Sequence, residues 1–318
     1  MASSKRKNFS VVGIIPHLYR PESRTLLLNS AIQSIIEAFK QSDYIDGSII
    51  VYINNFPPQQ NKTVFEKSFK VPNYTIEFLY SSINKGFTGA VNDAVMYALA
   101  RYCPNWYLVL NDDAQVTTKI FRQLNNVLKT KKYKIISGVV VNSEGEVEST
   151  GTTYYPTGLS FPTKNNPPDE IMPLFCGTCF FISDTLVQKR IRSIGYLLNP
   201  LYFAYYEDLE LSLWTQQHFL SSIYLSQQVI AVHQGSRTAI RGSEFQLFLG
   251  FRNAISTALI HWPVEKIILN LPFLLLGQAY MILLSWYKGY FLLYPKIVRY
   301  ILCHRKEIFF LRTRMSHE

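Results

Sequence analysis

The sequence is poor in cysteine and in charged residues, and both shortages limit what the protein can be. Its 318 residues include four cysteines, Cys103, Cys176, Cys179 and Cys303. This small number provides no disulfide framework and is typical of a reducing compartment. Charged residues make up 17% of the chain and hydrophobic residues 48%, so the composition excludes a disordered protein. Residues 1–8 contain no apolar stretch, and we therefore expect no secretory signal there.

Two patterns that often identify a binding site are incomplete. Cys176 and Cys179 form a Cys-x-x-Cys pair, which is found in zinc and redox sites. No second cysteine pair or nearby histidine completes a zinc site, so we favour a strand that packs two small side chains. Residues 84–92 contain two glycines between a predicted strand and a predicted helix, without the spacing of a dinucleotide-binding or Walker loop. Because glycines and a helix N-terminus suit a phosphate, this segment is a weak phosphate-site candidate.

The chain is basic, with a formal net charge of +10, and aromatic residues make up 14% of it. Such a protein suits an anionic partner: a nucleic acid, a phosphorylated small molecule or an anionic membrane surface. Nucleic acid is disfavoured because the sequence has no stripe of interleaved basic and aromatic residues. The basic residues near the two ends of the chain are Lys5, Arg6 and Lys7, and then Lys296, Arg299, His304, Arg305, Lys306, Arg312 and Arg314.

Apolar runs alternate with segments of helical periodicity along the first half of the chain. Strands that alternate with helices predict an α/β fold with a mostly parallel central sheet and helices on both faces. The expected strands are residues 9–16, 48–53, 75–80, 106–110 and 135–141, and the expected helices are residues 24–39, 90–101 and 120–128. Residues 142–172 are rich in Gly, Thr, Pro and Asn, so we expect loops and short strands that influence substrate specificity.

Asn111, Asp112 and Asp113 directly follow the apolar strand predicted at residues 106–110. In open α/β sheets, ligands bind outside the carboxyl ends of the strands. Two carboxylates at such a place need a partner because burying an unpaired charge is unfavourable. Mg²⁺ or Mn²⁺ carrying a diphosphate would suit them. The alternative is a polar turn in which Asp113 lies near the N-terminus of the next helix.

A second acidic pair, Glu207 and Asp208, follows an aromatic segment and begins an apolar helix. Acidic residues in a first turn complement the helix dipole, which is one explanation for the pair. The other is that Asp208 is a general base in an aromatic-walled pocket. Further on, His233 ends an edge or final strand predicted at residues 229–233. It is either a structural histidine or a third metal ligand.

Four stretches in this order resemble family 2 glycosyltransferases of the GT-A fold. They are residues 84–92, 111–113, 206–211 and 232–236, and the Phe-Arg-Asn tripeptide at residues 251–253 is also common in that family. Within the family, the chain looks like bacterial rhamnosyltransferases of surface-polysaccharide assembly. The resemblance covers about residues 9–253.

The resemblance implies a role for individual residues. It implies that Asp208 is the catalytic base and that Asp113 and His233 bind Mg²⁺ or Mn²⁺. Asn111 stands at the first acidic position of the family's metal motif, and Asn54 stands where the family usually has an aspartate that reads the nucleotide base. The donor-binding residues would be Pro16, Asn54, Asn84, Lys85, Gly86, Asn92, Asn111 and Asp112, and the acceptor-binding residues would be Glu207 and Trp214.

The implied activity is the transfer of a sugar from a nucleotide-diphosphate donor to a hydroxyl group of a lipid-linked glycan. A divalent cation would neutralise the leaving diphosphate, and a base would take the proton of the hydroxyl. Displacement would then invert the anomeric centre, as in inverting glycosidases. By resemblance we expect dTDP-rhamnose as the donor. The alternatives are a UDP-sugar donor, such as one carrying galactofuranose, and an inactive donor-binding or scaffold subunit of a glycan-assembly complex.

Residues 267–287 form a run of 21 residues without a charge, followed by aromatic and basic residues. A membrane-spanning helix needs about 20 apolar residues, and such flanks are typical of a membrane interface. A buried helical hairpin is the alternative. We expect a basic tail at residues 1–8, a catalytic domain at residues 9–260 and a membrane-association region at residues 261–318. This region would hold the domain on the cytoplasmic face of an anionic membrane, by interfacial or single-pass attachment. An oligomer is compatible with this arrangement.

Overall fold

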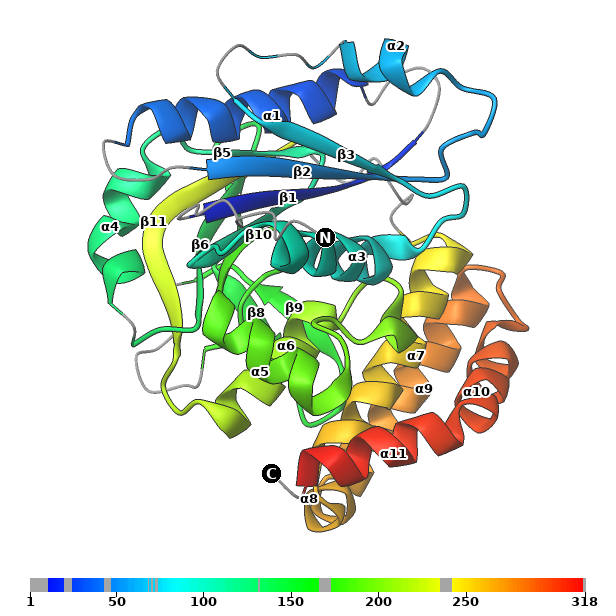
Figure 1. The fold of residues 1–318 in the computed structure, drawn as a ribbon. Coiled ribbons are helices and arrows are strands. Elements are labelled where there is room, and N and C mark those ends of the chain that lie inside the picture. The colour runs from blue at the N-terminus through cyan, green and yellow to red at the C-terminus, as the bar shows by residue number, and fades with distance from the viewer. Residues whose placement is uncertain are drawn as a thin grey trace.

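The computed structural model describes residues 11–19, 25–42, 47–67, 69, 71, 74–130, 132–165, 173–234 and 242–316. The predicted basic tail at residues 1–8, the start of the first predicted strand and Gly235 and Ser236 lie outside the described residues. Within the described ranges, the chain forms a central sheet with helices on both faces, as the alternating pattern predicted (Figure 1).

The central sheet is mostly parallel, and its strand order is β3-β2-β1-β4-β10-β6-β11-β5, with β7 paired to β6. Strands β1 to β4 run parallel to one another, whereas β10 lies antiparallel between β4 and β6. The strands of this sheet are β1 (Val11–Leu18), β2 (Gly47–Asn54), β3 (Ile76–Tyr80), β4 (Trp106–Leu110), β5 (Ala114–Val116), β6 (Ile135–Asn142), β7 (Val147–Ser149), β10 (Cys179–Ser183) and β11 (Ile223–His233). Strands β8 (Gly151–Tyr154) and β9 (Ser160–Thr163) form a separate hairpin, as expected for the middle of the chain.

Strand β11 is longer than the sequence pattern predicted, and it is not an edge strand where it ends. It begins at Ile223 rather than at residue 229, and it lies between β6 and β5. Its pairing with β6 shifts register between Ser226 and Val229. Polar, exposed residues at this irregularity interrupt the apolar pattern, and therefore only the last part of the strand could be read from the sequence.

Helices cover both faces of the sheet (Figure 1). Helices α1 and α4 pack on one face, and α3, α5 and α6 pack on the other. The helices up to the last sheet strand are α1 (Thr25–Lys40), α2 (Lys62–Lys67), α3 (Gly86–Arg101), α4 (Ile120–Lys129), α5 (Asp184–Ile194) and α6 (Glu207–His218), with a 3₁₀ turn η1 (Pro200–Tyr202) before α6. The helices after it are α7 (Glu244–His261), α8 (Val264–Leu269), α9 (Leu271–Tyr287), α10 (Leu293–Cys303) and α11 (Arg305–Ser316).

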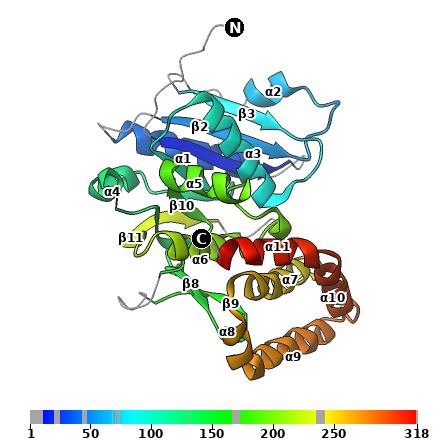
Figure 2. The ribbon, with the colours of Figure 1, turned by 60° about the horizontal axis from the view of Figure 1, so that its bottom comes forward.

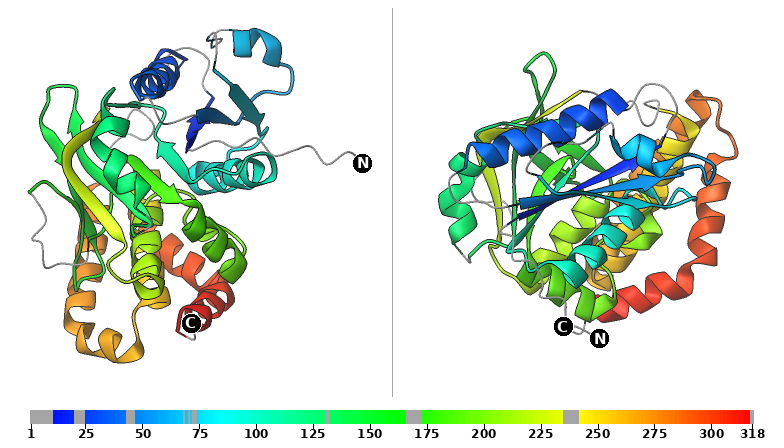
Figure 3. Two further views of the ribbon diagram at one scale, coloured as in Figure 1. Left: turned by 60° about the vertical axis from the view of Figure 1, so that its left-hand side comes forward. Right: turned by 45° about the horizontal axis from the view of Figure 1, so that its top comes forward.

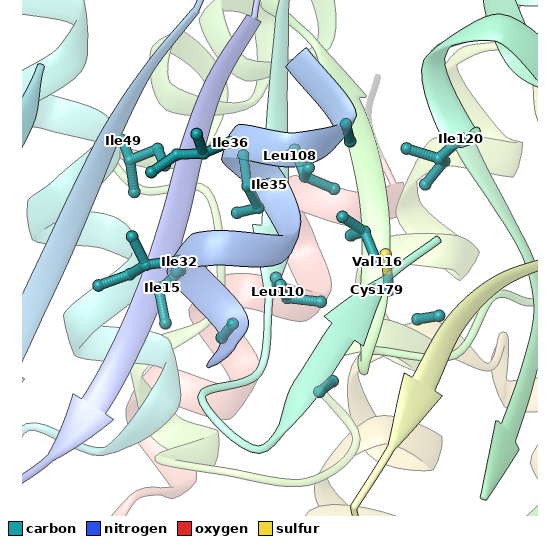
Figure 4. Packing of buried hydrophobic residues seen from close by; sticks show 14 of the residues in the cluster. Ile15, Ile32, Ile35, Ile36, Ile49, Leu108, Leu110, Val116, Ile120 and Cys179 are labelled. Atoms are coloured by element: carbon teal, nitrogen blue, oxygen red, sulfur yellow. The ribbon is translucent and has the colours of Figure 1, made fainter. Parts of the chain in front are cut away.

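Helix α1 fixes one face of the sheet through a branched aliphatic core. Ile32, Ile35 and Ile36 are fully buried and point toward Ile15 and Leu108 of the sheet (Figure 4). Their spacing places all three on one side of the helix. Burying each such side chain contributes roughly 1.5–3 kcal/mol, so this contact holds the strand ends that carry the polar residues of the candidate site.

Helices α5, α6 and α7 are joined by a buried ionic network that the sequence analysis did not identify. Arg190 of α5 and Glu210 of α6 form an ion pair with both side chains fully buried. His261 Nε2 of α7 lies 3.1 Å from Glu210 Oε1. Burial alone would raise the pKa of Glu210, but Arg190 and His261 outweigh it and lower the pKa to about 2. The network therefore contains a carboxylate that stays charged because both partners are in place.

We expect Glu210→Gln to lower the free energy of unfolding by about 3–5 kcal/mol, because it leaves Arg190 buried without a counter-charge. Urea denaturation would measure the loss. The matched control is Glu37→Gln, since Glu37 pairs with Lys40 at the surface and should change stability by less than about 1 kcal/mol.

The pH dependence of stability in the wild type and in Glu210→Gln tests the same ion pair. The pKa of Glu210 in the folded protein lies below its ordinary value of 4.5. The ion pair therefore contributes fully to the free energy of unfolding above pH 4.5, and this contribution is lost as the pH falls through about 2. The difference between the wild type and Glu210→Gln should therefore shrink as the pH falls. A difference that stays constant on acidification would contradict the assignment.

The C-terminal helices lie at the end of the molecule opposite α1 and α2 (Figures 2 and 3). The apolar run predicted at residues 267–287 is not one helix, because it is divided at Asn270 between α8 and α9. Pro272 in the first turn of α9 cannot donate the hydrogen bond that would continue α8. Among the helices of the described ranges, none is both long and apolar enough to cross a membrane.

Candidate active site

The polar residues of the candidate site lie at the carboxyl ends of neighbouring strands. Asn54 ends β2, His17 lies near the end of β1, and Asn111 follows β4. His17 Nδ1 lies 2.7 Å from Asp112 Oδ2, and both residues are buried. This contact ties the end of β1 to the end of β4. The sequence analysis named the adjacent Pro16, which is buried in β1, and missed His17.

Asp113 and His233 meet through the pairing of β5 with β11, in which His233 lies opposite Ala114. His233 Nε2 is 3.2 Å from Asp113 Oδ1. The other ring nitrogen, Nδ1, is 2.6 Å from Oε2 of Glu148, the middle residue of β7. Sequence reasoning missed Glu148, because nothing in a short polar strand indicates which distant histidine it contacts.

The pair formed by Asp113 and His233 needs a proton or a cation between its two facing atoms. If His233 donates its Nδ1 proton to Glu148, a neutral ring presents a lone pair from Nε2 to the carboxylate. Two lone pairs 3.2 Å apart repel each other unless a proton or a cation lies between them. Burial alone would lower the pKa of His233, but Asp113 and Glu148 outweigh it and raise the pKa to about 9. The arrangement therefore attracts either a proton or a metal ion.

Gly86 brings the loop at residues 84–86 into contact with the segment before α6. Its φ is +70°, and an added Cβ atom would lie 2.3 Å from the backbone oxygen of Phe203. The amide of Thr88 also donates to that oxygen, at 3.1 Å. Asn54 holds the loop from the other side, since it accepts from the amide of Lys85 and donates to the oxygen of Gly86. Only glycine satisfies both the conformation and the space.

Three predicted binding residues make contacts within the protein, and one of them, Lys85, is still half-exposed. Asn92 donates to the oxygen of Leu198 and accepts from the amides of Leu197 and Leu198, so both ends of its side chain fix a loop. Lys85 Nζ pairs with Asp93 at the surface. Trp214, which we expected to contact the acceptor, has a side chain that is 1% exposed and lies between the Arg190 guanidinium and the ring of His218.

The segment at residues 203–206 is strained, and α7 holds it in place. Phe203, Tyr205 and Tyr206 have φ values of 62°, 67° and 70°, which side-chain-bearing residues rarely adopt. The amide group of Asn253 lies within 3.0 Å of the backbone oxygens of Tyr202, Ala204 and Tyr205. Its neighbour Arg252 donates to the oxygens of residues 201 and 202. The Phe-Arg-Asn tripeptide therefore has a physical role, which is to clamp the strained segment.

The acidic pair at the start of α6 lies where this strained segment ends. Asp208 Oδ2 accepts from the amide of Gly177 at 2.8 Å, and the oxygen of Thr178 accepts from the amide of Asn111 at 3.0 Å. The short segment between the two cysteines thus connects Asp208 to the end of β4. Cys176 and Cys179 are both free. Cys179 is buried in β10, as expected, whereas Cys176 precedes the strand and is half-buried.

Glu207 and Asp208 are both held in surroundings that favour a bound proton. Burial and then the charge of Asp208 raise the pKa of Glu207 to about 8. Burial also raises the pKa of Asp208, although the amides of Leu209 and Gly177 oppose this. Within the part of the chain that the structure describes, Glu207 Oε2 is buried without a hydrogen-bond partner. Such an oxygen suits a ligand that brings its own hydrogen-bond donor.

The site thus combines polar residues at the strand ends, among them Asp113 and His233, with a carboxylate of raised pKa, on an α/β sheet. The model of glycosyl transferase family 2 matches residues 26–191, which is more than half of the chain. The chain therefore belongs to glycosyl transferase family 2.

Comparisons with individual proteins agree with this family. The low-salt glycan biosynthesis hexosyltransferase Agl10 of Haloferax volcanii is 29% identical over 186 residues, which cover 56% of this chain and 58% of that protein. The chain thus matches less than two thirds of this relative's length.

Two solved structures are similar in fold. One is S. aureus TarS 1–349, with a TM-score of 0.54 and 12% identity over 84% of this chain and 70% of that chain. The other is the mannosyltransferase PcManGT from Pyrobaculum calidifontis in complex with GDP-Man and Mn²⁺, with a TM-score of 0.54 and 11% identity over 99% of this chain and 87% of that chain. These likenesses show a GT-A-like fold, which confirms the expected fold class.

We expect Asn253→Ala to release the segment at residues 203–206, because the backbone oxygens that Asn253 binds lose their shared donor. Hydrogen exchange of the amides of residues 203–210 should become at least about tenfold faster, as expected for local opening that costs less free energy. Ser256→Ala is the matched control, since Ser256 is equally buried in α7 and bonds only within its own helix. If exchange in this segment is equally slow in both variants, the clamp is not what holds it.

Proposed function

We propose that the protein is an inverting glycosyltransferase that moves a hexose from a nucleotide-diphosphate donor to a hydroxyl group of a glycan. One observation carries the proposal: in a family 2 chain, Asp113 and His233 lie at the same end of the sheet as the acidic pair at the start of α6, which Gly177 and Thr178 connect to the end of β4. Strand-end carboxylates suit a diphosphate with its metal ion, and a second, desolvated carboxylate suits proton transfer. Trp214 has no part in this proposal, because it is buried elsewhere.

The residues of the site fit a divalent cation. Asp113 Oδ1 and His233 Nε2 face each other at 3.2 Å, and both atoms are ordinary metal ligands. No group of three or more such side chains gathers in the described ranges. A cation held by two side chains would therefore take its remaining ligands from the donor diphosphate and water, as Mg²⁺ commonly does. When bound, such a cation would stabilise the negative charge of the leaving diphosphate.

Asp208 is the residue that we assign as the base. Its partly desolvated carboxylate has a raised pKa, which brings it closer to neutral pH and strengthens it as a proton acceptor. The amide of Gly177 fixes one of its oxygens, so the side chain cannot rotate freely. Proton removal from an acceptor hydroxyl on the face opposite the leaving diphosphate gives inversion of the anomeric centre.

The donor that we propose is dTDP-rhamnose, and the acceptor is a lipid-linked glycan. The donor rests on the resemblance of the sequence to bacterial rhamnosyltransferases, and a UDP-sugar is the alternative. The Haloferax volcanii relative is named as a hexosyltransferase of glycan biosynthesis, which supports a glycan acceptor. A scaffold subunit without activity is disfavoured because the chain keeps Asp113, Asp208 and His233.

Asp208→Asn should lower turnover by roughly 10²–10⁴-fold, the usual contribution of a positioned acid–base group. Donor binding should change little, because Asn has the same shape and the base does not hold the diphosphate. The measurement is nucleotide release with an acceptor present, with donor binding measured separately. Glu207→Gln is the matched variant. If Glu207→Gln is inactive while Asp208→Asn turns over normally, the base is Glu207, and if both turn over normally the base lies elsewhere.

Asp113→Asn should remove most Mn²⁺-dependent binding of the donor nucleotide, because a neutral amide is a poor ligand for a hard cation. Glu148→Gln should weaken it about 10–100-fold, the usual effect of removing a group that orients a metal-binding histidine. Calorimetric titration with dTDP and with UDP, each with Mn²⁺ or a chelator, measures this and also identifies the nucleotide. Glu146→Gln is a control on the neighbouring turn. Equal binding in excess chelator would exclude the metal.

A further inference from the structure

The C-terminal helices expose a large apolar surface that nothing in the described part of the chain covers. We define this C-terminal apolar surface by Leu269, Leu276, Leu283, Trp286, Tyr287 and Phe291. These six side chains are between 54% and 84% exposed. Soluble proteins rarely leave so many large apolar side chains together in water, and such a surface marks a protein or membrane contact.

In the part of the chain that the structure describes, the buried side of α9 is a narrow stripe. Its buried residues are Gly277, Met281 and Ser285, which recur every fourth position on one side of the helix. Gly277 approaches the backbone closely enough that a Cβ atom would lie 2.3 Å from the oxygen of Thr157. The helix contains no charged residue, so the sides away from this stripe are apolar. The alternative of a buried helical hairpin is therefore wrong for α9.

The net charge of the C-terminal helices favours lipid over protein. Residues 264–316 contain eight lysines and arginines and two glutamates, Glu265 and Glu307, which gives a net charge of +6. In the described ranges, Lys288, Arg299 and Lys306 have no carboxylate within salt-bridge distance. Trp286 and Tyr287 lie beside Lys288 at one end of α9. Aromatic rings next to lysine, at the border of an apolar helix face, are typical of residues at the level of lipid headgroups.

We propose that this surface docks in the plane of an anionic membrane, with α9 lying along the boundary between headgroups and acyl chains. A helix of 17 residues is about 26 Å long, and its apolar sides would enter the bilayer while the surrounding cations bind anionic headgroups. A second copy of the chain is a poorer occupant, because it would bring the same excess of positive charge to the interface. A lipid bilayer is therefore the partner that we assign to this surface.

The docking surface and the candidate site are parts of one packed unit. Leu293 and Ile297 of α10 pack against Phe251 of α7, next to the clamp residues. Tyr300 of α10 donates to the oxygen of Leu201, at 2.9 Å, in the 3₁₀ turn that precedes the strained segment. The site is thus held at a fixed height above the docked surface. Given the proposed function, this arrangement suits an acceptor whose lipid end stays in the bilayer.

The test is flotation of the full-length protein with vesicles in a density gradient. The protein should float with phosphatidylcholine vesicles that contain roughly 30% phosphatidylglycerol, should bind pure phosphatidylcholine more weakly, and should lose binding as salt is raised. Leu276→Glu with Leu283→Glu should lower the partition coefficient at least about tenfold, because two exposed leucines no longer enter the acyl region.

Leu26→Glu with Leu220→Glu is the matched control, since these leucines are 78% and 86% exposed elsewhere and should not affect flotation. Sedimentation without vesicles measures whether the protein is a dimer, and so tests a second copy of the chain as the occupant of this surface. If the wild type does not float, or if it is a dimer that Leu276→Glu with Leu283→Glu converts to a monomer, the lipid proposal is wrong. Flotation needs no catalytic turnover, so an inactive protein that floats overturns only the proposed function.

Discussion

The candidate site depends on hydrogen bonds from one amide group, that of Asn253, to the backbone of the segment before α6. That segment contains three residues with positive φ, each costing roughly 1–3 kcal/mol. A chain relaxes such backbone unless its surroundings hold it. Asn253 and Arg252 bind carbonyl groups that the strained geometry turns toward α7. The benefit of the strain is positional, because α6 can then begin with Glu207 and Asp208 at the carboxyl end of the sheet.

The buried carboxylates of the site and of the neighbouring core each have a different stabilising environment. A buried carboxylate without a partner would destabilise the fold, and the carboxylates near the site have different partners. Asp208 accepts hydrogen bonds from backbone amides, Asp112 contacts the ring of His17, and Asp113 contacts the ring of His233. Glu210 receives a full counter-charge from Arg190 and is structural. Among these carboxylates, Glu207 keeps a buried oxygen without a partner in the described ranges, so this oxygen can accept a hydrogen bond from a ligand.

Much of the fold was predictable, because buried strands and amphipathic helices reveal themselves through local periodicity. Strand β4 was predicted to the residue, and the Asn111–Asp113 segment was placed correctly at its carboxyl end. The features that could not be predicted depend on contacts between residues that are distant in the sequence. His17, Glu148 and Asn253 carry no local pattern that identifies their partners, and the buried position of Trp214 follows from α5 packing on α6. The proline that divides α8 from α9 was visible, but helix propensity alone did not show that the apolar run would break there.

The close approach of Gly86 to Phe203 has a consequence for how this sequence can vary. The clash that any side chain at position 86 would meet is with a backbone oxygen, so no change of the side chain at position 203 can relieve it. A second obstacle, the positive φ, is independent of the first. No second substitution can therefore compensate for a side chain at position 86. In a randomised library, active variants should carry many residues at position 85 but only glycine at position 86.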